Sequence, residues 1–313
     1  MAAQKIIIDT DPGQDDAVAL LLALASPKEL EILGVTTVAG NVPLKLTSRN
    51  ARIICELADR PEVGVYAGSD RPLRRDLVTA EYVHGKTGLD GADLPEPTMP
   101  LQPTEAADFI VEAVLGTKPG TVTLCTLGPL TNIGTALQRE PRLASSLQQI
   151  VMMGGGFFEG GNTTPTAEFN IYVDPEAAAL VFTSGIPITM MPLDVTHRAL
   201  TTPEFIGQVK ALGTPVGQAT AGRLQFYEQY DRRRYGTSGA PLHDPCVIAY
   251  LLKPQLFRGR ACNVEVETLS SLTLGMTVVD WWGQTDRPRN AMVMRDIDAD
   301  DYFDLIVERL SEL

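Results

Sequence analysis

The sequence has few groups that bind polyanions. Its 313 residues contain 26 lysines and arginines against 39 aspartates and glutamates, which gives a formal net charge of −13. Nucleic acids and anionic membrane surfaces are bound through basic patches, so this deficit of positive charge argues against both as partners. It also disfavours phosphorylated small molecules, unless a local pocket or a metal reverses the field.

Cysteine and long apolar runs are scarce as well. The four cysteines, Cys55, Cys125, Cys246 and Cys262, stand far apart without a C-x-x-C pair, which predicts buried reduced thiols and not a zinc site. No apolar run approaches the roughly 18 residues that a membrane-spanning helix needs. A carboxylate at Asp9 follows too soon after the first residue for a signal peptide. These features predict a cytoplasmic protein without a membrane partner.

Short apolar runs alternate with helical patterns through the first two thirds of the chain. Strands are predicted at Lys5–Asp9, Leu30–Val38, Val63–Ala67, Thr121–Thr126, Gln149–Met153 and Ile186–Pro192. Helices are predicted at Asp15–Ala25, Leu44–Ala58, Glu105–Leu115, Pro129–Gln138 and Pro175–Ser184. This alternation predicts an α/β fold with a mostly parallel central sheet and helices on both faces.

The last third of the chain has a different pattern. It consists of helices from Thr201 to near Leu252, strand-like runs at Val264–Val279 and Asn290–Val293, and a final helix at Asp300–Leu310. Two long loops, Asp70–Pro103 and Gly154–Val173, interrupt the earlier alternation, and loops of this length are usually functional. No linker separates a second domain, so residues 1–313 are predicted to form one domain with added C-terminal helices and short strands.

The densest chemical feature is the segment Ile6–Ala17 (IIIDTDPGQDDA). Its four carboxylates, Asp9, Asp11, Asp15 and Asp16, fall between a predicted strand and a predicted helix. In a parallel sheet that junction is where ligands bind. Four acids crowded there repel one another unless a cation is present, and hard oxygen ligands favour Ca²⁺ or Mg²⁺. Helix capping would explain one of these acids, but four of them predict a metal site.

The segment DTDPGQDDA resembles the N-terminal fingerprint of the nucleoside hydrolase (N-ribohydrolase) family of inosine-uridine type. Further similar segments follow in order: VAGNVPL, HGKTGLDG, TLGPLTN, the glycines after Met153, EFNIYVDPEA, DVTH and HDPC. The stretches GLDG…LPEPT and GAPLHDP are most similar to bacterial pyrimidine-preferring ribonucleoside hydrolases. The resemblance implies a Rossmann-like nucleoside hydrolase fold and hydrolysis of the N-glycosidic bond.

The same resemblance implies a Ca²⁺ ion and its ligands. These are Asp11, Asp16, the backbone carbonyl of Thr126 and Asp244. Without the resemblance, Thr126 is equally well read as part of an ordinary turn before Gly128. The cation would lower the pKa of a water molecule, and Asp11 would remove the proton from that water.

Residues that bind the ribose are also implied by the resemblance. They are Asp15, Asn41, Asn162, Glu168 and Asn170, whose carboxylates and carboxamides suit a cis diol. Asn41 and Asn170 are alternatively turn residues, because asparagine tolerates left-handed backbone geometry. Asp174 precedes Pro175 where a helix N-cap belongs, and is assigned to structure.

Histidine is the rarest of these functional residue types. The chain has three, His84, His197 and His243. By resemblance, His243 protonates or hydrogen-bonds the leaving base and His84, in a loop predicted to be mobile, lines the base pocket; histidine suits both tasks near neutral pH. Each could instead be an ordinary hydrogen-bonded histidine, and His197 is read as structural. Tyr230 is a candidate to stack on the base, while the arginines that follow it are read as a solvated face.

The predicted function is Ca²⁺-dependent hydrolysis of ribonucleosides to free base and ribose, with uridine and cytidine preferred. Within the family, a purine-preferring or broad inosine-uridine hydrolase is the alternative. Outside it, a metal-dependent phosphohydrolase would need a phosphate-binding lysine that cannot be identified. A non-catalytic nucleoside-binding protein would not need both Asp11 and His243. The family further implies a homodimer or homotetramer that serves nucleoside salvage or catabolism.

Overall fold

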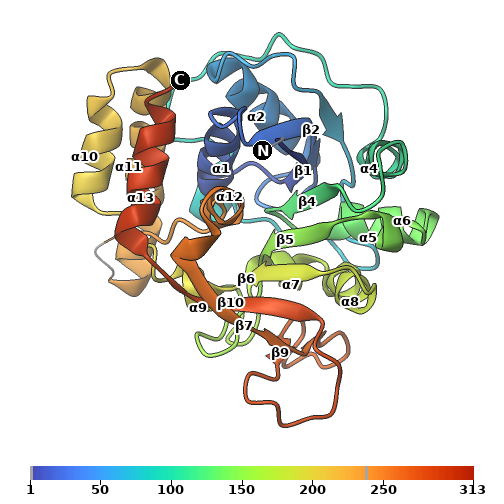
Figure 1. Ribbon diagram of the computed structural model, residues 1–313. Helices are drawn as coiled ribbons and strands as arrows, with labels where there is room; N and C mark the ends of the chain where they lie inside the picture. The colour runs from blue at the N-terminus through green and yellow to red at the C-terminus, as the bar shows by residue number, and fades with distance from the viewer. Residues whose placement is uncertain (1–2, 237–238) are drawn as a thin grey trace.

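The computed structural model describes residues 3–236 and 239–313, which form a central β-sheet with helices on both faces (Figure 1). Within this part of the chain the sheet has eight strands in the order β3-β2-β1-β4-β5-β6-β10-β7. Neighbouring strands are parallel, except for the antiparallel pair β10–β7. The strands are β1 (Gln4–Thr10), β2 (Leu30–Thr37), β3 (Val65–Ala67), β4 (Val122–Thr126), β5 (Gln149–Met153), β6 (Ile188–Met191), β7 (Phe257–Cys262) and β10 (Ala291–Ile297).

Each face of the sheet has its own hydrophobic core, because successive side chains of a strand point to opposite faces. On β1, Ile6 and Ile8 belong to one core and Ile7 to the other. The first core is covered by α1 (Gln14–Leu24), α2 (Leu44–Leu57), α10 (Pro203–Ala211), α11 (Pro215–Tyr235), α12 (Pro245–Leu252) and α13 (Ala299–Leu310). The second core is covered by α4 (Ala106–Leu115), α5 (Thr131–Arg139), α6 (Leu143–Ser146) and α8 (Pro175–Thr183).

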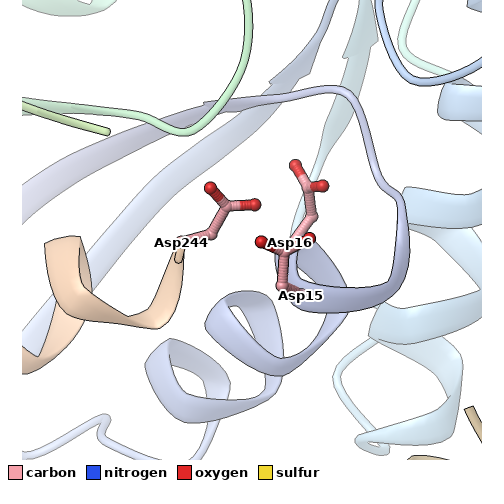
Figure 2. A group of neighbouring side chains, drawn as sticks. All are labelled: Asp15, Asp16 and Asp244. Atoms are coloured by element: carbon pink, nitrogen blue, oxygen red, sulfur yellow. The ribbon is translucent and has the colours of Figure 1, made fainter. Parts of the chain in front are cut away.

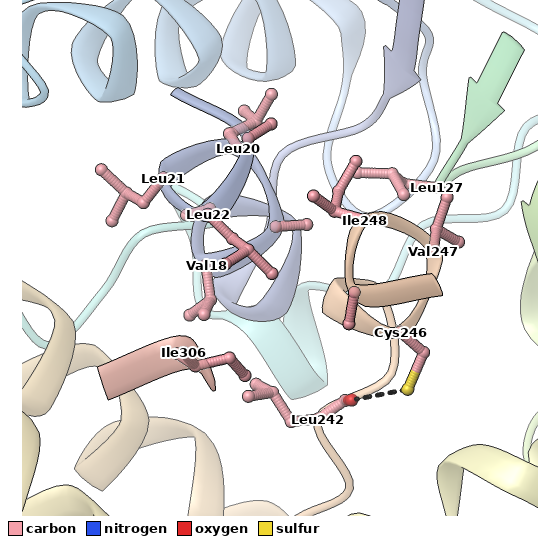
Figure 3. Close-up of a cluster of buried hydrophobic side chains, with 14 of the residues drawn as sticks. Val18, Leu20, Leu21, Leu22, Leu127, Leu242, Cys246, Val247, Ile248 and Ile306 are labelled. Carbon is pink, nitrogen blue, oxygen red and sulfur yellow. Dashed lines mark hydrogen bonds between the residues drawn. The ribbon is translucent and has the colours of Figure 1, made fainter. Parts of the chain in front are cut away.

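Helix α1 is buried along its whole length, since its sequence QDDAVALLLAL is apolar on every side after the first turn. Figure 3 shows Leu22 of α1 in one cluster with Ile248 of α12 and Ile306 of α13. The Cys246 thiol on α12 donates a hydrogen bond to the carbonyl of Leu242 at 3.7 Å. This packing fixes the first turn of α1 relative to the first turn of α12.

The predicted fold class is confirmed. The strands β3-β2-β1-β4-β5-β6 follow the doubly wound order of Rossmann-like folds, and each predicted strand and helix up to residue 191 occurs within a few residues of its expected bounds. All four cysteines are free and buried, as predicted. Asp174 caps α8 by accepting a hydrogen bond from the Ala177 amide at 3.0 Å.

Some predictions for individual segments are wrong. Only the ends of the strand-like run Val264–Val279 form strands, β8 (Val264–Val266) and β9 (Thr277–Val279), because turns between them end in Gly275 with a φ of 78°. Strand β7 was not predicted, since its sequence FRGRAC has four exposed residues at the sheet edge. The pair Trp281-Trp282 lies in a strand-like region, which predicts that both pack; Trp281 is buried, but Trp282 is 66% exposed.

Short helical segments complete the described chain. They are α3 (Glu81–His84), α7 (Phe169–Val173), α9 (Leu193–Thr196) and the 3₁₀ turn η1 (Pro254–Leu256). Both long loops of the sequence thus contain a short helix, α3 in the first and α7 in the second. None of the helices in residues 3–236 and 239–313 is long and apolar enough to cross a membrane.

Candidate active site

The candidate site lies at the carboxyl ends of β1 and β4, where the strand order reverses. Asp9 on β1 pairs in register with Thr126 on β4, and the sheet continues from β1 to β2 on one side and from β4 to β5 on the other. Such a reversal opens a crevice above the sheet. A pocket of about 470 Å³ lies there, within the range of small-molecule sites.

The structure brings the predicted site residues together around this pocket. Nine of them line it: Asp15, Asn41, His84, Asn162, Glu168, Asn170, Tyr230, His243 and Asp244. The other three, Asp11, Asp16 and Thr126, are fully buried. Asp11 and Asp16 adjoin the lining through hydrogen bonds with Asn41.

Three carboxylates form a cluster beside the pocket. Figure 2 shows Asp15 and Asp16 on the first turn of α1, with the carboxylate of Asp244 facing them from the start of α12. One carboxylate oxygen from each lies within 4.8 Å of the others. Asp244 precedes α12 but its side chain makes no capping hydrogen bond, so capping does not explain this carboxylate.

Burial and mutual repulsion perturb the cluster. Desolvation, followed by the charge of Asp16, raises the pKa of Asp15 to about 8. Desolvation also raises the pKa of Asp244 well above its ordinary value, and the charges of its three neighbouring aspartates add to this. A bound cation would favour the ionised form of each carboxylate. The electrostatics therefore fit a cation site.

Asp11 lies in a narrow space between two glycines. A Cβ atom on Gly40 would lie 2.1 Å from Asp11 Oδ2, and one on Gly128 would lie 2.2 Å from Oδ1. Asp11 Oδ2 accepts a hydrogen bond from the Asn41 amide at 2.7 Å, whereas the buried Oδ1 has no hydrogen-bond partner among the described residues. An unpartnered buried carboxylate oxygen is costly, and a cation at this oxygen would remove that cost.

Asp16 combines helix capping with a place in the acidic cluster. Its Oδ2 accepts hydrogen bonds from the Gly13 amide at 2.9 Å and from Asn41 Nδ2 at 3.0 Å. Its Oδ1 accepts one from Thr10 Oγ1 at 2.5 Å. These bonds hold the loop between β1 and α1 in one conformation. The donor set of buried carboxylates, with the β4 turn beside Asp11, fits a hard divalent cation such as Ca²⁺ or Mg²⁺.

The polar lining residues that follow β5 are fixed by hydrogen bonds with the backbone. Glu168 caps α7 through the Asn170 amide at 3.0 Å and also accepts from the Gly155 amide at 2.9 Å. Burial raises the pKa of Glu168 to about 7. Asn170 Nδ2 donates to the Leu127 carbonyl at 2.7 Å, and Asn162 Oδ1 accepts from the Phe169 amide at 3.0 Å.

The alternative reading of two asparagines as turn residues is not supported. Among described non-glycine residues only Asp59 has a positive φ, so neither Asn41 nor Asn170 uses a left-handed backbone. Both side chains instead make specific hydrogen bonds at the edge of the pocket. Both residues line the pocket.

His84 lies at the end of α3, within the long loop where the sequence places it, and its side chain is buried. Its Nδ1 accepts a hydrogen bond from the Gln14 amide at 3.2 Å, and its ring stacks on Tyr227 with a centroid separation of 5.7 Å. Burial lowers the pKa of His84 to about 4. Since a backbone amide can only donate, the neutral ring must carry its proton on Nε2.

The other two histidines lie next to each other, with ring centroids 5.7 Å apart. His243 Nδ1 lies 2.7 Å from Thr196 Oγ1, and burial lowers the pKa of His243 well below its ordinary value. His197 also lines the pocket, with its Nδ1 3.4 Å from Glu159 Oε2. His197 therefore lies at the pocket, and its reading as mainly structural stays a prediction.

Several further lining residues were not singled out as site residues. They include Tyr82, Glu159 and Tyr227. The aromatic residues spaced along α11 signalled Tyr227. Tyr82 on the short helix α3 and Glu159 in an irregular loop have no distinguishing pattern. The arginines 232–234 are exposed, as expected for a solvated face.

Comparisons with known proteins agree with this geometry. A model of the family described as inosine-uridine preferring nucleoside hydrolase matches residues 6–304. An uncharacterized protein of Schizosaccharomyces pombe is 52% identical, and a protein of Photobacterium profundum named pyrimidine-specific ribonucleoside hydrolase RihA is 50% identical; each match covers 99% of both chains. A purine-preferring ribonucleoside hydrolase from Gardnerella vaginalis superposes with a TM-score of 0.91 at 32% identity, covering 98% of each chain. The chain therefore belongs to the inosine-uridine preferring nucleoside hydrolase family, and its enzyme class is N-glycosyl hydrolase.

Proposed function

We propose that this protein hydrolyses the N-glycosidic bond of ribonucleosides, with uridine and cytidine preferred, and that it uses Ca²⁺. The observation that supports this most directly is the juxtaposition of the acidic cluster with His84 and His243 around one pocket. The carboxylates of the acidic cluster can bind a cation and the hydroxyls of a ribose, and the histidines can donate hydrogen bonds to a departing base.

The cation would be held by Asp11, Asp16, Asp244 and the carbonyl of Thr126. Asp15 contributes a further carboxylate to the same cluster. A divalent cation bound there would supply positive charge and lower the pKa of a water molecule. Asp11, whose Oδ1 has no hydrogen-bond partner among the described residues, would hold that cation and would accept the proton of the water through its carboxylate.

The remaining carboxylates act on the sugar. Asp15 and Glu168 accept hydrogen bonds from ribose hydroxyls, and Asn41, Asn162 and Asn170 complete the ring of polar groups. When the glycosidic bond breaks, positive charge develops on the ribosyl group, and fixed carboxylates stabilise it without reorganising. The backbone hydrogen bonds to Glu168 keep its carboxylate in place before the reaction.

The leaving base takes hydrogen bonds from the histidines. A neutral His84 offers its Nε2–H, since Nδ1 is occupied by the Gln14 amide. For His243, Thr196 occupies Nδ1, which leaves Nε2 for the base. Tyr230, also on the pocket lining, is the candidate to stack on the ring.

The base preference is tested with a substrate panel. We expect kcat/KM for uridine and cytidine to exceed that for inosine and adenosine by about tenfold or more, a range typical of pocket-based discrimination. The support is the 50% identity to a hydrolase named pyrimidine-specific. Free base and reducing sugar are measured for each nucleoside.

The same panel includes uridine 5′-monophosphate. No lysine or arginine is among the described residues that line the pocket, so we expect neither cleavage of the nucleotide nor release of inorganic phosphate. Faster turnover of inosine than uridine would reassign the base preference. Phosphate release would instead support the phosphohydrolase.

The ribose contacts predict a requirement for the 2′-hydroxyl. Deoxyuridine should be cleaved more slowly than uridine by roughly 10- to 100-fold, because polar groups that lose a hydrogen-bond partner cost about 1–3 kcal/mol. Initial rates of uracil release from both nucleosides measure this. Equal rates would contradict the assignment of Asp15 and the asparagines to the diol.

Two further expectations stay predictions. The family resemblance predicts a homodimer or homotetramer, which sedimentation measurements can test. A cytoplasmic location is expected from the composition, and a role in nucleoside salvage or catabolism follows from the proposed reaction.

A further inference from the structure

Arg223, on α11, is a buried arginine without an ion pair among the described residues. Its side chain is 0% exposed. Nη1 donates to the Gln14 carbonyl at 3.1 Å and Nη2 to Thr220 Oγ1 at 3.2 Å, while Nε has no hydrogen-bond partner in the described part of the chain. Burying a cation this way is costly, so its position calls for an explanation beyond packing.

The partner of Arg223, Gln14, connects three segments of the site. Its backbone amide donates to His84 Nδ1 at 3.2 Å, and its side-chain Nε2 donates to the His84 carbonyl at 3.2 Å. The same Nε2 donates to the Asp90 carbonyl at 2.8 Å. Gln14 itself is the first residue of α1 and directly precedes Asp15. Gln14 thus connects the first turn of α1, which carries Asp15 and Asp16, with Arg223, His84 and Asp90.

Helix α11 contacts His84 a second time, through Tyr227. Arg223 and Tyr227 are four residues apart and therefore lie on one face of the helix. Tyr227 stacks on the imidazole of His84, while Arg223 holds the residue that hydrogen-bonds its Nδ1. Helix α11 therefore constrains the His84 ring in two ways, directly through Tyr227 and indirectly through Gln14.

The loop after His84 is also in backbone contact with α11. A Cβ atom on Gly91 would lie 2.7 Å from the Gly222 carbonyl oxygen, and one on Gly222 would lie 2.5 Å from the Gly91 carbonyl oxygen. Only glycine at both positions permits this approach. A shift of α11 must therefore move the segment that contains His84.

We propose that Arg223 and Gln14 are positioning residues for the base end of the site. They connect α11 and the His84 segment to the first turn of α1, which carries Asp15 and Asp16. The base-binding side chains therefore keep their place and His84 keeps one tautomer. This inference rests on the proposed function in one respect, because it takes the base to bind beside His84. It assigns a role to two residues that do not line the pocket.

The kinetic test compares two substrates in the variant Arg223→Met, which keeps a long unbranched side chain and removes the charge and the donors. Uracil is a poor leaving group, so kcat/KM for uridine should fall by about 10- to 100-fold, the size of effect that a small misplacement of a catalytic side chain causes. A p-nitrophenyl riboside needs little assistance and should lose less than about threefold. Arg223→Lys retains one donor for Gln14 and should lose less than Arg223→Met on uridine. Arg233→Met removes an exposed arginine from the same helix and should leave both rates unchanged.

A spectroscopic test does not depend on turnover. The chain has three histidines, so ¹⁵N-histidine labelling gives a simple spectrum in which His84→Gln identifies the signals of His84. The wild type should show the neutral Nε2–H tautomer at His84, and Arg223→Met and Gln14→Ala should show a mixture of tautomers or exchange broadening. If Arg223→Met does not fold, the His84 signals of Arg223→Lys and Gln14→Ala decide whether the positioning role holds.

Unchanged His84 signals together with equal losses on both substrates would overturn the positioning role. A wild-type protein that cleaves no nucleoside would instead overturn the proposed function. In that case the histidine spectrum still decides whether Arg223 and Gln14 fix the ring.

Discussion

Replacing Asp11 by alanine is expected to lower kcat on uridine by more than about 10⁴-fold. One general base alone contributes about 10²–10⁴-fold, and this change also removes a carboxylate from the predicted cation site. Asp11 Oδ1 has no hydrogen-bond partner among the described residues. Burial and the charge of Asp16 raise the pKa of Asp11 well above its ordinary value. Packing of the fold does not explain a carboxylate in this state. Initial rates of uracil release measure the effect.

Asp11→Asn separates charge from packing in this experiment. Its amide oxygen can still accept the hydrogen bond from the Asn41 amide, yet we expect it to be as inactive as Asp11→Ala. Both variants should bind Ca²⁺ more weakly by calorimetry and keep a cooperative thermal transition. Asp304→Ala, which changes an exposed aspartate on α13, is the control. Near-normal turnover in pure Asp11→Ala protein would rule out the proposed mechanism.

Replacing His243 by alanine should lower kcat on uridine by about 10²–10⁴-fold, the usual contribution of one acid-base group. The physical reason is the poor leaving ability of a pyrimidine, which needs a hydrogen bond or a proton as it departs. The nitrophenyl riboside has a good leaving group and should be affected far less. The ratio of the two losses is the measurement.

The ratio also distinguishes two roles of His243. This residue directly precedes Asp244, so its replacement could act by displacing that carboxylate. Equal losses on both substrates, accompanied by weaker Ca²⁺ binding, would assign His243 to holding Asp244. A selective loss on uridine with unchanged Ca²⁺ binding would assign it to the base.

The parts of the site that the sequence predicted best are those within one strand-to-helix junction. Asp11, Asp15 and Asp16 follow a strand that is apolar on both faces, and the geometry of a parallel sheet then places them at its ligand-binding edge. Asp244 lies on a different helix far along the chain, and only the family resemblance connected it with the other three. Distance in sequence, and not chemistry, set that limit.

The Arg223–Gln14 contact could not be predicted for a related reason. Its two residues are 209 positions apart and are joined by a hydrogen bond to a backbone carbonyl, which leaves no charge pattern in the sequence. Strand β7 escaped prediction because an edge strand with exposed arginines lacks the apolar run of an interior strand. The exposure of Trp282 was not predicted, because its sequence neighbour Trp281 is buried and the two residues cannot be distinguished by composition.

The meeting of α1 and α12 at the acidic cluster has a consequence for the order of folding. Asp15 and Asp16 leave the ribosome among the first residues, whereas Asp244 follows only after most of the sheet has been synthesised. Contacts that join such distant segments close long loops and form late. The acidic cluster proposed to hold the cation is therefore completed only when α12 docks, so an incomplete chain contains its N-terminal carboxylates without the enclosure that surrounds them in the folded protein.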